Sequence, residues 1–381
     1  MKLGATLTTE KKPVKQQYIT MLICWLAYVT VTFARYSYIA NIALVESDYG
    51  VTHASAGLVM TFFSITYGIG QVINGIFCAR YPRRAIVSLS LIGSAACEFL
   101  IYTRVSFYLI KYIWLFNACF QSLLWPMLMQ IISENVSPKL RSKAVLVMST
   151  TTSAGIFLIY GVSALVVKIS NFRQTFFIGT LVLVLVALIW FILYKPGKYM
   201  KISSFAKKNE SAENEKKSTV KAVVIIPVVI VCIFGVVVSF VKDGLQTWVP
   251  VILKDIHKMP DSMSILLTIF LPVFGIFGAT LTVYLNKVIT KLIVLFMLLF
   301  TFTAGFNIIV LNFKDNLFIL IASFALLELF LHGASNICVS IFPLAMCEKL
   351  SAGLIAGIVN GASYVGSSLS SFVLGKIAIK K

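Results

Sequence analysis

Long apolar stretches, separated by short polar breaks, run along almost the whole chain. A helix needs about 20 apolar residues to cross the hydrocarbon core of a bilayer. Backbone groups in lipid are satisfied only in helices or closed barrels, and these stretches are continuous rather than alternating, so they predict transmembrane helices. We expect an all-α polytopic membrane protein with eleven spans, near residues 18–45, 54–79, 84–103, 107–133, 143–168, 173–194, 222–253, 262–286, 290–312, 316–346 and 351–379.

Charged residues are scarce. They make up 12% of the 381 residues, and hydrophobic residues make up 59%, whereas a soluble protein is about a quarter charged. The formal net charge of +19 could indicate nucleic-acid binding. The basic residues, however, lie in the breaks between apolar stretches, as they do in the loops of membrane proteins. We therefore expect a multi-pass protein of the cell membrane, of bacterial inner-membrane type. Its expected partner is the lipid bilayer and not nucleic acid.

Lys and Arg are distributed unevenly between the two sides that the spans define. Segments on the side of the amino terminus hold 21 of them, and segments on the other side hold six before the carboxyl tail. The positive-inside rule then places the amino terminus in the cytoplasm. The chain divides into a cytoplasmic tail, a six-helix half, a solvated cytoplasmic linker and a second half, at residues 1–17, 18–194, 195–221 and 222–381.

A shift of 207 residues superposes the two halves. It pairs Arg35 with Lys242, Arg80 with Lys287, Arg84 with Lys291, Trp125-Pro126 with His332-Gly333, and Thr152-Ser153 with Val359-Asn360. A constant offset predicts two parallel repeats with a substrate site near the midplane between them. The second repeat holds five spans, so we expect that a loop and a twelfth helix are missing after Lys381.

Six segments carry distinctive local patterns: FSITYGIGQVINGIFCARYPRR (Phe63–Arg84), Leu124-Trp125-Pro126, Arg141-Ser142-Lys143-Ala144, FVKDGLQTWVPVIL (Phe240–Leu253), LHGASNICVSIFP (Leu331–Pro343) and GIVNGASYVGSSLSSFVLG (Gly357–Gly375). They resemble the major facilitator superfamily and, within it, the organophosphate:phosphate antiporter group. The resemblance covers nearly the whole chain. It implies a major facilitator fold of two six-helix halves with the last helix missing, and a basic loop motif at Arg80, Arg83 and Arg84.

Charges inside spans are costly in lipid and mark function by default. Arg35 lies about ten residues, roughly 15 Å at helical rise, from the outer end of its span, which is far for snorkelling to the headgroups. Lys242 holds the equivalent place in the second half. The two cations would clamp an anion, because Arg offers a planar fork and Lys a point charge. The resemblance implies the same, since the family's substrate-binding basic pair matches Arg35 and Lys242.

Two ionisable residues of the second half are candidates for coupling or gating. Asp243 adjoins Lys242 but should point elsewhere, because neighbours on a helix do not share a face. It either pairs with another helix to set a gate or takes part in proton coupling. His332, with Asn336 one turn later, either packs within the bundle or binds substrate or protons. Two further acids toward the outer ends of spans are expected to snorkel or to bind between helices: Glu98 and Glu328.

Polar faces on other spans complete the predicted site. Tyr67 with Gln71, and Asn360 with Tyr364, recur at i,i+4 spacing. Such side chains either line a site or hold helices together. The expected substrate-binding residues are Arg35, Lys242, Tyr67, Gln71, Trp125, Thr152, His332, Asn336, Asn360 and Tyr364.

Three positions depart from the family's pattern. The phosphate exchangers carry a lysine where this chain has Gln71 and a histidine where it has Thr152, and the superfamily's usual loop acid is Ala79 here. A less basic cavity makes a carboxylate or sulfonate an option beside an organophosphate. We expect a monomeric secondary transporter of a small organic anion, working by alternating access through exchange or proton cotransport.

Two other functions stay open. A proton-driven exporter of hydrophobic compounds should show acidic residues deep in the cavity, where the sequence offers basic and polar ones. A transporter-like membrane sensor would be favoured by a large regulatory tail. The sequence predicts no enzyme, cofactor or metal site, because it shows no nucleophile–base pair or phosphate loop and its seven cysteines include no CxxC pair.

Overall fold

The structure is a computed structural model that describes residues 13–195, 214–258, 270–313, 315–347 and 349–378. The described chain is mainly helical, with its helices in the order α1 (Val14–Ala40), α2 (Ile42–Tyr49), α3 (His53–Phe77), α4 (Arg83–Tyr102), α5 (Phe107–Ser122), α6 (Leu124–Asn135), α7 (Pro138–Ser149), α8 (Thr151–Ile169), α9 (Arg173–Leu193), α11 (Asn214–His257), α13 (Phe270–Val288), α14 (Leu292–Asn312), α15 (Leu317–Asn336), the π-helix η1 (Ile337–Ile341), α16 (Phe342–Ala345) and α17 (Ala352–Ala378).

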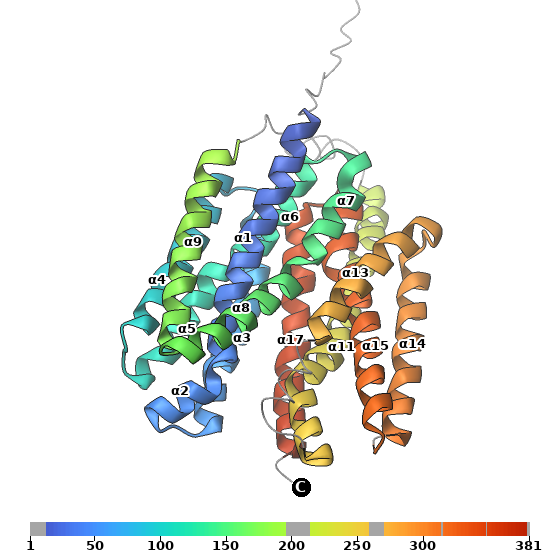
Figure 1. Ribbon diagram of the computed structural model, residues 1–381. Coiled ribbons are helices and arrows are strands. Elements are labelled where there is room, and N and C mark those ends of the chain that lie inside the picture. The colour runs from blue at the N-terminus through green and yellow to red at the C-terminus, as the bar shows by residue number, and fades with distance from the viewer. Residues whose placement is uncertain (1–12, 196–213, 259–269, 314, 348, 379–381) are drawn as a thin grey trace, which may run out of the picture.

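Eleven helical segments of the described chain are long and apolar enough to cross a membrane, which confirms the expected number of spans. Some segments join two or three helices, such as α5 with α6, or α15 with η1 and α16. In Figure 1, most of α1 to α9 lie on the left and α11 to α15 lie on the right, with α17 near the middle; α7 extends across to α13. We call the end where α1 begins, at the top of Figure 1, the basic end.

Several element boundaries differ from the predicted ones, and two of them change how the chain is divided. The first span was expected to reach residue 45, but α1 ends at Ala40 and α2 is a separate short helix. The turn is held at Asn41, whose Nδ2 donates to the Ser37 carbonyl (2.9 Å) and whose Oδ1 accepts from the Ser163 hydroxyl (2.7 Å). Helix α11 begins at Asn214, inside the segment 195–221 expected to be a linker. The predicted start of the eighth span, at 262, lies outside the described residues.

Pro126 accounts for a break that shapes the interior. Proline has no N–H, so the carbonyl four residues earlier, on Ser122, lacks its helical donor. Helix α5 ends at Ser122, and Gln71 Nε2 of α3 donates to that carbonyl instead (3.1 Å). The helix break thus fixes the orientation of one of the predicted site residues.

Helices α3 and α17 form the main contact between the two halves. They run antiparallel, and four contacts follow one another along them: Tyr67 with Tyr364, Gln71 with Asn360, Gly75 with Gly357, and Cys78 with Ser351. A Cβ at Gly75 would lie 2.9 Å from the Gly357 Cα, so both glycines are needed for this approach. We call this row of contacts the α3–α17 seam.

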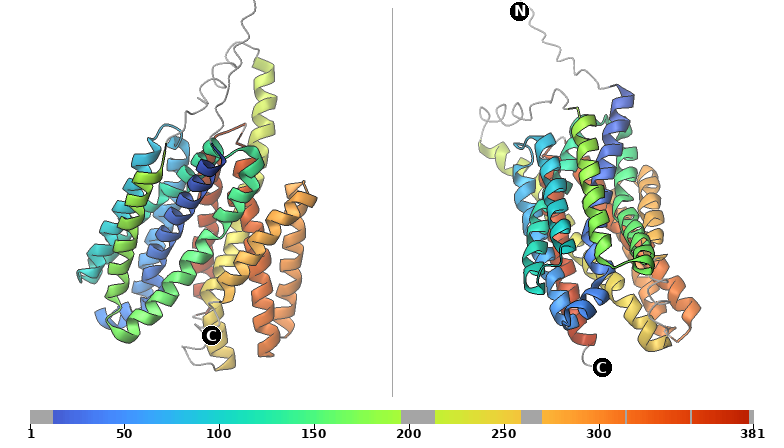
Figure 2. Two further views of the ribbon diagram at one scale, coloured as in Figure 1. Left: turned by 45° about the horizontal axis from the view of Figure 1, so that its top comes forward. Right: turned by 60° about the vertical axis from the view of Figure 1, so that its left-hand side comes forward.

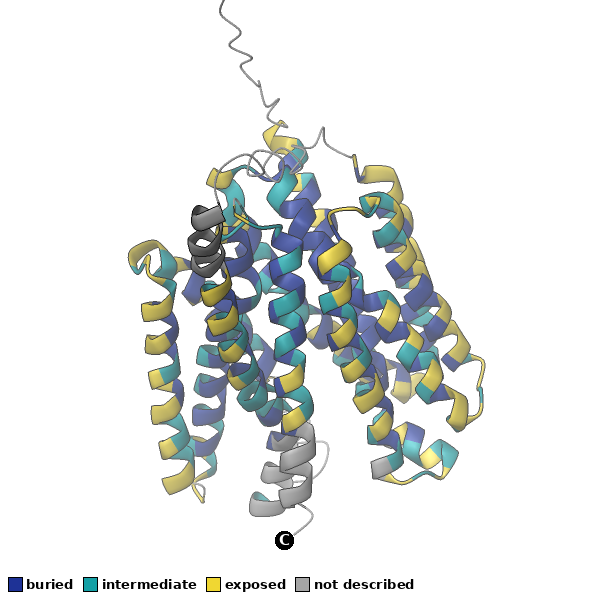
Figure 3. Cartoon of the chain, turned by 180° about the vertical axis from the view of Figure 1, so that it is seen from behind, coloured by how far each residue is buried: buried dark blue, intermediate teal, exposed yellow. Residues whose placement is uncertain are grey.

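Apolar side chains cover the outside of the bundle. Figure 3 shows exposed residues along the outer edges of the helices and buried ones between them. Ile169 and Phe318, for example, are more than four-fifths exposed, while many polar residues, including Arg35 and Glu328, are buried inside. This arrangement of apolar outside and polar inside suits a protein surrounded by lipid. Figure 2 shows the helices side by side from two further directions.

Candidate functional site

Arg35 lies inside the bundle, in the last third of α1, and is 6% exposed. Its Nε donates to Gln121 Oε1 of α5 (3.0 Å), and its Nη1 donates to the Tyr364 hydroxyl of α17 (2.7 Å). Its Nη2 is buried without a hydrogen-bond partner among the described residues. The guanidinium is therefore held by two neutral groups, and the N–H donors of Nη2 remain available.

Aromatic rings surround this guanidinium. Its central carbon lies 4.2 Å from the ring centroid of Tyr67 and 5.3 Å from that of Phe63. The Tyr67 hydroxyl is 3.3 Å from that of Tyr28, and the Tyr28 ring is 4.6 Å from Trp125. Ring faces stabilise a cation without neutralising it. The predicted residues Arg35, Tyr67 and Trp125 thus belong to one connected cluster.

Both halves contribute to this cluster. Tyr364 of the second half meets Arg35 and Tyr67 of the first. One turn earlier on α17, Asn360 Nδ2 donates to Gln71 Oε1 (3.2 Å). A solute bound at Arg35 would therefore touch side chains from the two halves at once.

Lys242 lies beside its own neighbour on α11. Its Nζ is 3.4 Å from Asp243 Oδ1, and Asp243 also accepts a hydrogen bond from the Ser367 hydroxyl of α17. The expectation that Asp243 points away from Lys242 is wrong, because the flexible four-carbon lysine side chain folds back onto the carboxylate. Tyr364 and Ser367 are three residues apart and share a face of α17, so this helix joins the Arg35 cluster to the Lys242–Asp243 pair.

His332 pairs with Glu328, one turn earlier on α15. Glu328 Oε1 lies 2.9 Å from His332 Nδ1 and accepts a hydrogen bond from Gln246 Nε2 of α11 (2.6 Å). Glu328 is fully buried, so of its two expected roles the structure shows binding between helices and not snorkelling. Glu98 likewise is fully buried, and both its oxygens accept from the Ser37 hydroxyl (3.1 Å).

Two predicted residues lie apart from these groups. Asn336 Nδ2 donates to the Ala279 carbonyl (3.2 Å) and thereby joins α15 to α13. Thr152 is half-buried near the start of α8. No contact described in the structure brings either residue to Arg35.

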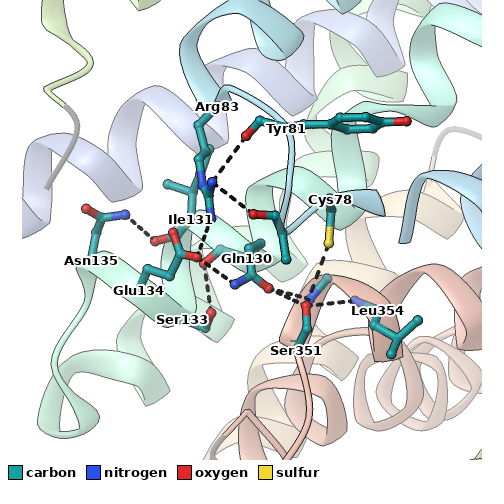
Figure 4. Close-up of polar contacts among 12 residues, drawn as sticks. Cys78, Tyr81, Arg83, Gln130, Ile131, Ser133, Glu134, Asn135, Ser351 and Leu354 are labelled. Carbon is teal, nitrogen blue, oxygen red and sulfur yellow. Dashed lines mark hydrogen bonds and ion pairs between the residues drawn. The ribbon is translucent and has the colours of Figure 1, made fainter. Parts of the chain in front are cut away.

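Figure 4 shows a hydrogen-bonded chain at the basic end that connects the two halves. Arg83 forms an ion pair with Glu134 (2.6 Å), and Gln130 Nε2 donates to the same carboxylate (2.6 Å). Gln130 Oε1 accepts from the Ser351 hydroxyl (2.7 Å) and the Gly353 N–H (3.1 Å). Gln130 of the first half thus caps the start of α17 in the second. We call these five residues the basic-end latch.

The rest of the predicted loop motif lies beside this latch. Arg84 Nη2 donates to the Tyr194 carbonyl (2.5 Å), which ties α4 to the end of α9, and Arg80 is exposed. Cys78 Sγ lies 3.7 Å from Ser351 Oγ, and burial raises the pKa of this thiol to about 11. Of the three arginines, Arg83 alone is in the latch.

The family assignment follows from a match over most of the chain. The model of the Major Facilitator Superfamily matches residues 24–371. The chain belongs to the major facilitator superfamily. Among curated relatives it is similar to "Membrane sensor protein UhpC" of Escherichia coli K12, with 28% identity over 122 residues. The protein of the same name from Salmonella typhimurium LT2 is 28% identical over 123 residues. Each match covers 31% of this chain and 28% of the relative.

Solved superfamily structures share the fold. The proton:xylose symporter XylE, bound to 6-bromo-6-deoxy-D-glucose, has a TM-score of 0.68 at 12% identity, covering 96% of this chain and 90% of that one. The human organic anion transporter MFSD10 (TETRAN) has a TM-score of 0.71 at 12% identity, covering 96% and 94%. At this identity the likeness extends to the fold alone.

Several contacting residues were absent from the sequence prediction, and three of them hold other site residues or helices in place. Gln121 holds Arg35, Ser367 holds Asp243, and Gln130 caps α17. The internal repeat contained a signal for the first, because a shift of 207 places Gln121 on Glu328, a charged residue inside a span. Ser367 and Gln130 are uncharged, and no pattern in the sequence distinguishes them from other buried polar residues.

Proposed function

We propose that this superfamily member is a secondary transporter that moves a small organic anion across a cell membrane by alternating access. The observation that carries the proposal is the buried guanidinium of Arg35 between the halves. Its described hydrogen-bond partners, Gln121 and Tyr364, are neutral, and Nη2 has none. A buried cation without a carboxylate partner is costly, so an anion bound there is strongly favoured.

The surroundings of Arg35 indicate the class of anion. An arginine fork matches the paired oxygens of a phosphate, carboxylate or sulfonate, and the rings of Tyr67 and Trp125 suit an organic portion of the solute. Lys242 supplies a second cation when a solute displaces Asp243 from it. We therefore propose an organophosphate, or an organic carboxylate or sulfonate.

The contacts between the halves support a rocking movement. The α3–α17 seam and the basic-end latch lie on the basic side of Arg35, so the halves are joined between the site and that end. Opening toward the basic end requires the latch to separate. We propose that the basic end faces the cytoplasm, as the excess of Lys and Arg there suggests, and that the protein works as a monomer.

Export of hydrophobic compounds was expected to require acids deep in the cavity. The structure does place two carboxyl groups in the central part of the second half, on Asp243 and Glu328. The unneutralised charge of Arg35 nevertheless favours an anion over a neutral or cationic compound. A sensor that binds the same anion is the second candidate, because both curated relatives are named membrane sensors.

Counterflow in proteoliposomes tests the proposal. Vesicles loaded with inorganic phosphate, glucose 6-phosphate, lactate or methanesulfonate would be diluted into trace amounts of the same labelled solute. We expect transient accumulation of at least one of these anions, because exchange requires no energy source.

Variants connect the transport to the site. Arg35→Ala and Lys242→Ala should each abolish counterflow while inserting normally. Lys168→Ala removes an exposed cation at the end of α8 and should transport like the unaltered protein. Full transport by Arg35→Ala would contradict the two-cation site. Saturable binding of an anion without counterflow would favour the sensor.

A further inference from the structure

A cavity of about 230 Å³ lies between the two halves toward the basic end. Helix α7 of the first half lines one side of it, and α13, η1 and α16 of the second half line the other. Helix α7 contacts α13 and η1, and none of these helices belongs to the α3–α17 seam. No residue that lines the cavity belongs to the Arg35 cluster or the basic-end latch. The cavity is therefore a part of the interface that the proposed transport site does not use.

The lining of this cavity changes from polar to apolar with depth. Arg141 and Ser142 lie in the first two turns of α7, and Asn286 lies in the last turn of α13, so these side chains are nearest the basic end. About one turn deeper lie Val145 on α7 and Val283 on α13. A phospholipid has the same order, because its polar headgroup lies at the membrane surface and its apolar tails lie below.

The helices that line the cavity carry positive charges and no negative ones. Helices α7, α13, η1 and α16 contain no Asp or Glu, and their basic residues are Lys139, Arg141, Lys143 and Lys287. Glu134, near the end of α6, is paired with Arg83 in the latch. Arg141 lines the cavity itself, and the lysines add to the local positive potential. This charge distribution favours an anionic ligand.

Asn286 adds a requirement for hydrogen bonding. Its Oδ1 is buried and has no hydrogen-bond partner among the described residues. Leaving such a group unsatisfied is costly, and an apolar chain would not satisfy it. A hydroxyl group both donates and accepts, so a hydroxylated headgroup suits either orientation of this amide. Phosphate oxygens match the guanidinium of Arg141.

We propose that this cavity binds an anionic phospholipid from the leaflet at the basic end. The phosphate contacts Arg141, and a hydroxylated headgroup such as that of phosphatidylglycerol contacts Asn286. Because the lipid touches both halves at once, it stabilises the arrangement in which they are closed at this end. The inference goes beyond the transport function proposed above and does not require it.

Native mass spectrometry of the delipidated protein tests the site. Dioleoyl phosphatidylglycerol and dioleoylglycerol have the same chains, but the second lacks the phosphate. We expect the unaltered protein to retain the first lipid and not the second, and this comparison needs no variant. Arg141→Gln removes the charge and should weaken phosphatidylglycerol binding about tenfold. Asn286→Leu removes the amide and should weaken it about threefold.

Lys143→Gln is the matched control. It removes the same charge from the same helix, but Lys143 Nζ lies 3.2 Å from the Tyr18 hydroxyl of α1 and does not line the cavity. Phosphatidylglycerol binding should therefore change little. An equal loss in Lys143→Gln and Arg141→Gln would indicate general attraction to the basic end and would overturn the cavity site. Equal retention of dioleoylglycerol, or unchanged binding in both Arg141→Gln and Asn286→Leu, would overturn it as well.

A free phosphate ion presents some of the same chemistry. Excess inorganic phosphate should leave phosphatidylglycerol bound, because the ion has no tail to contact Val145 and Val283. Displacement would assign the cavity to a free anion and overturn the lipid proposal. Arg35→Ala should bind the lipid unchanged, which separates this site from the transport site. Absence of counterflow would contradict the transport function and leave the lipid site standing.

The thiol of Cys78 tests the closure. It lies 3.7 Å from the Ser351 hydroxyl of the other half, so it becomes accessible when the halves separate at the basic end. Phosphatidylglycerol should slow the labelling of Cys78 by a thiol reagent about threefold in the unaltered protein and much less in Arg141→Gln. Equal labelling of the unaltered protein with and without the lipid would overturn its stabilisation of the closed arrangement.

Discussion

The two halves place a cation at equivalent positions but surround it with different chemistry. Arg35 is held by Gln121 and by aromatic rings, all neutral. Lys242 lies beside Asp243, and the position equivalent to Gln121 holds Glu328. The first half thus presents a charge that is constant at any physiological pH, whereas the cation of the second half lies beside a carboxylate that offsets it. Arg35 of the first repeat would attract the anion, and the Lys242–Asp243 pair of the second repeat would rearrange when the anion binds.

The largest loss of anion affinity is expected when Gln121 of the first half is replaced by the acid that the second half has at the equivalent position, Glu328. Gln121→Glu would place a carboxylate against Arg35 and neutralise the attracting charge. We expect the apparent affinity for the transported anion to fall about 100-fold, or about 3 kcal/mol. The measurement is counterflow at graded anion concentrations. Gln121→Met, which adds no charge at the same position, serves as the control; an equal loss in it would mean that packing and not charge is responsible.

A smaller loss of anion affinity is expected from a change at Tyr364, the α17 residue that contacts Arg35 of the first half. Tyr364→Phe keeps the ring against Tyr67 and removes the hydroxyl that accepts from Arg35. A hydrogen bond to a charged group contributes about 1.5–3 kcal/mol, so we expect roughly a tenfold loss of affinity in the same assay. Unchanged affinity would show that the guanidinium is positioned by Gln121 and the rings alone.

The latch that joins the halves can be followed through Cys78. Removing the cap with Gln130→Ala costs about 1 kcal/mol and should favour separation of the halves at the basic end. The thiol would then be more exposed, and its pKa would move down from about 11 toward its ordinary value. We expect about fivefold faster labelling by a thiol reagent near neutral pH. Cys78→Ser gives the background from the other cysteines, and equal rates would contradict the latch.

The smallest loss of anion affinity is expected from a change at Ser367, the α17 residue that contacts Asp243 of α11. Ser367→Ala removes the hydroxyl that donates to Asp243, so the carboxylate competes more strongly for Lys242. The loss of one neutral donor corresponds to about 0.5–1 kcal/mol and a roughly threefold lower affinity for the anion. A larger effect than that of Tyr364→Phe would reverse the assignment of anion attraction to the first half.

The sequence predicted the spans well because crossing a bilayer imposes a length and an apolar composition that any chain must show. It also predicted that Tyr67, Gln71, Asn360 and Tyr364 lie near Arg35, because polar groups and charges inside spans are few. Boundaries were less predictable. The end of α1 depends on two contacts of Asn41, one of them with a helix more than a hundred residues later.

Side-chain pairing was the part that the sequence could not determine. Helical geometry indicated that Lys242 and Asp243 point apart, but a long side chain is free to fold back. Glu328 and His332 are spaced for contact, yet only the position of Gln246 on another helix shows which oxygen of Glu328 is occupied. Such choices depend on how helices are rotated about their axes, and apolar stretches carry little information about that rotation.

Where Gly75 meets Gly357, backbone lies against backbone and no side chain interlocks. Surfaces without interdigitated side chains can turn against each other while losing only weak contacts. Helices α3 and α17 could therefore rotate against each other at this crossing point with a small energy barrier. The temperature dependence of turnover should then reflect the polar contacts broken at the ends of the bundle, and a bulkier residue at either glycine should make the movement itself slow.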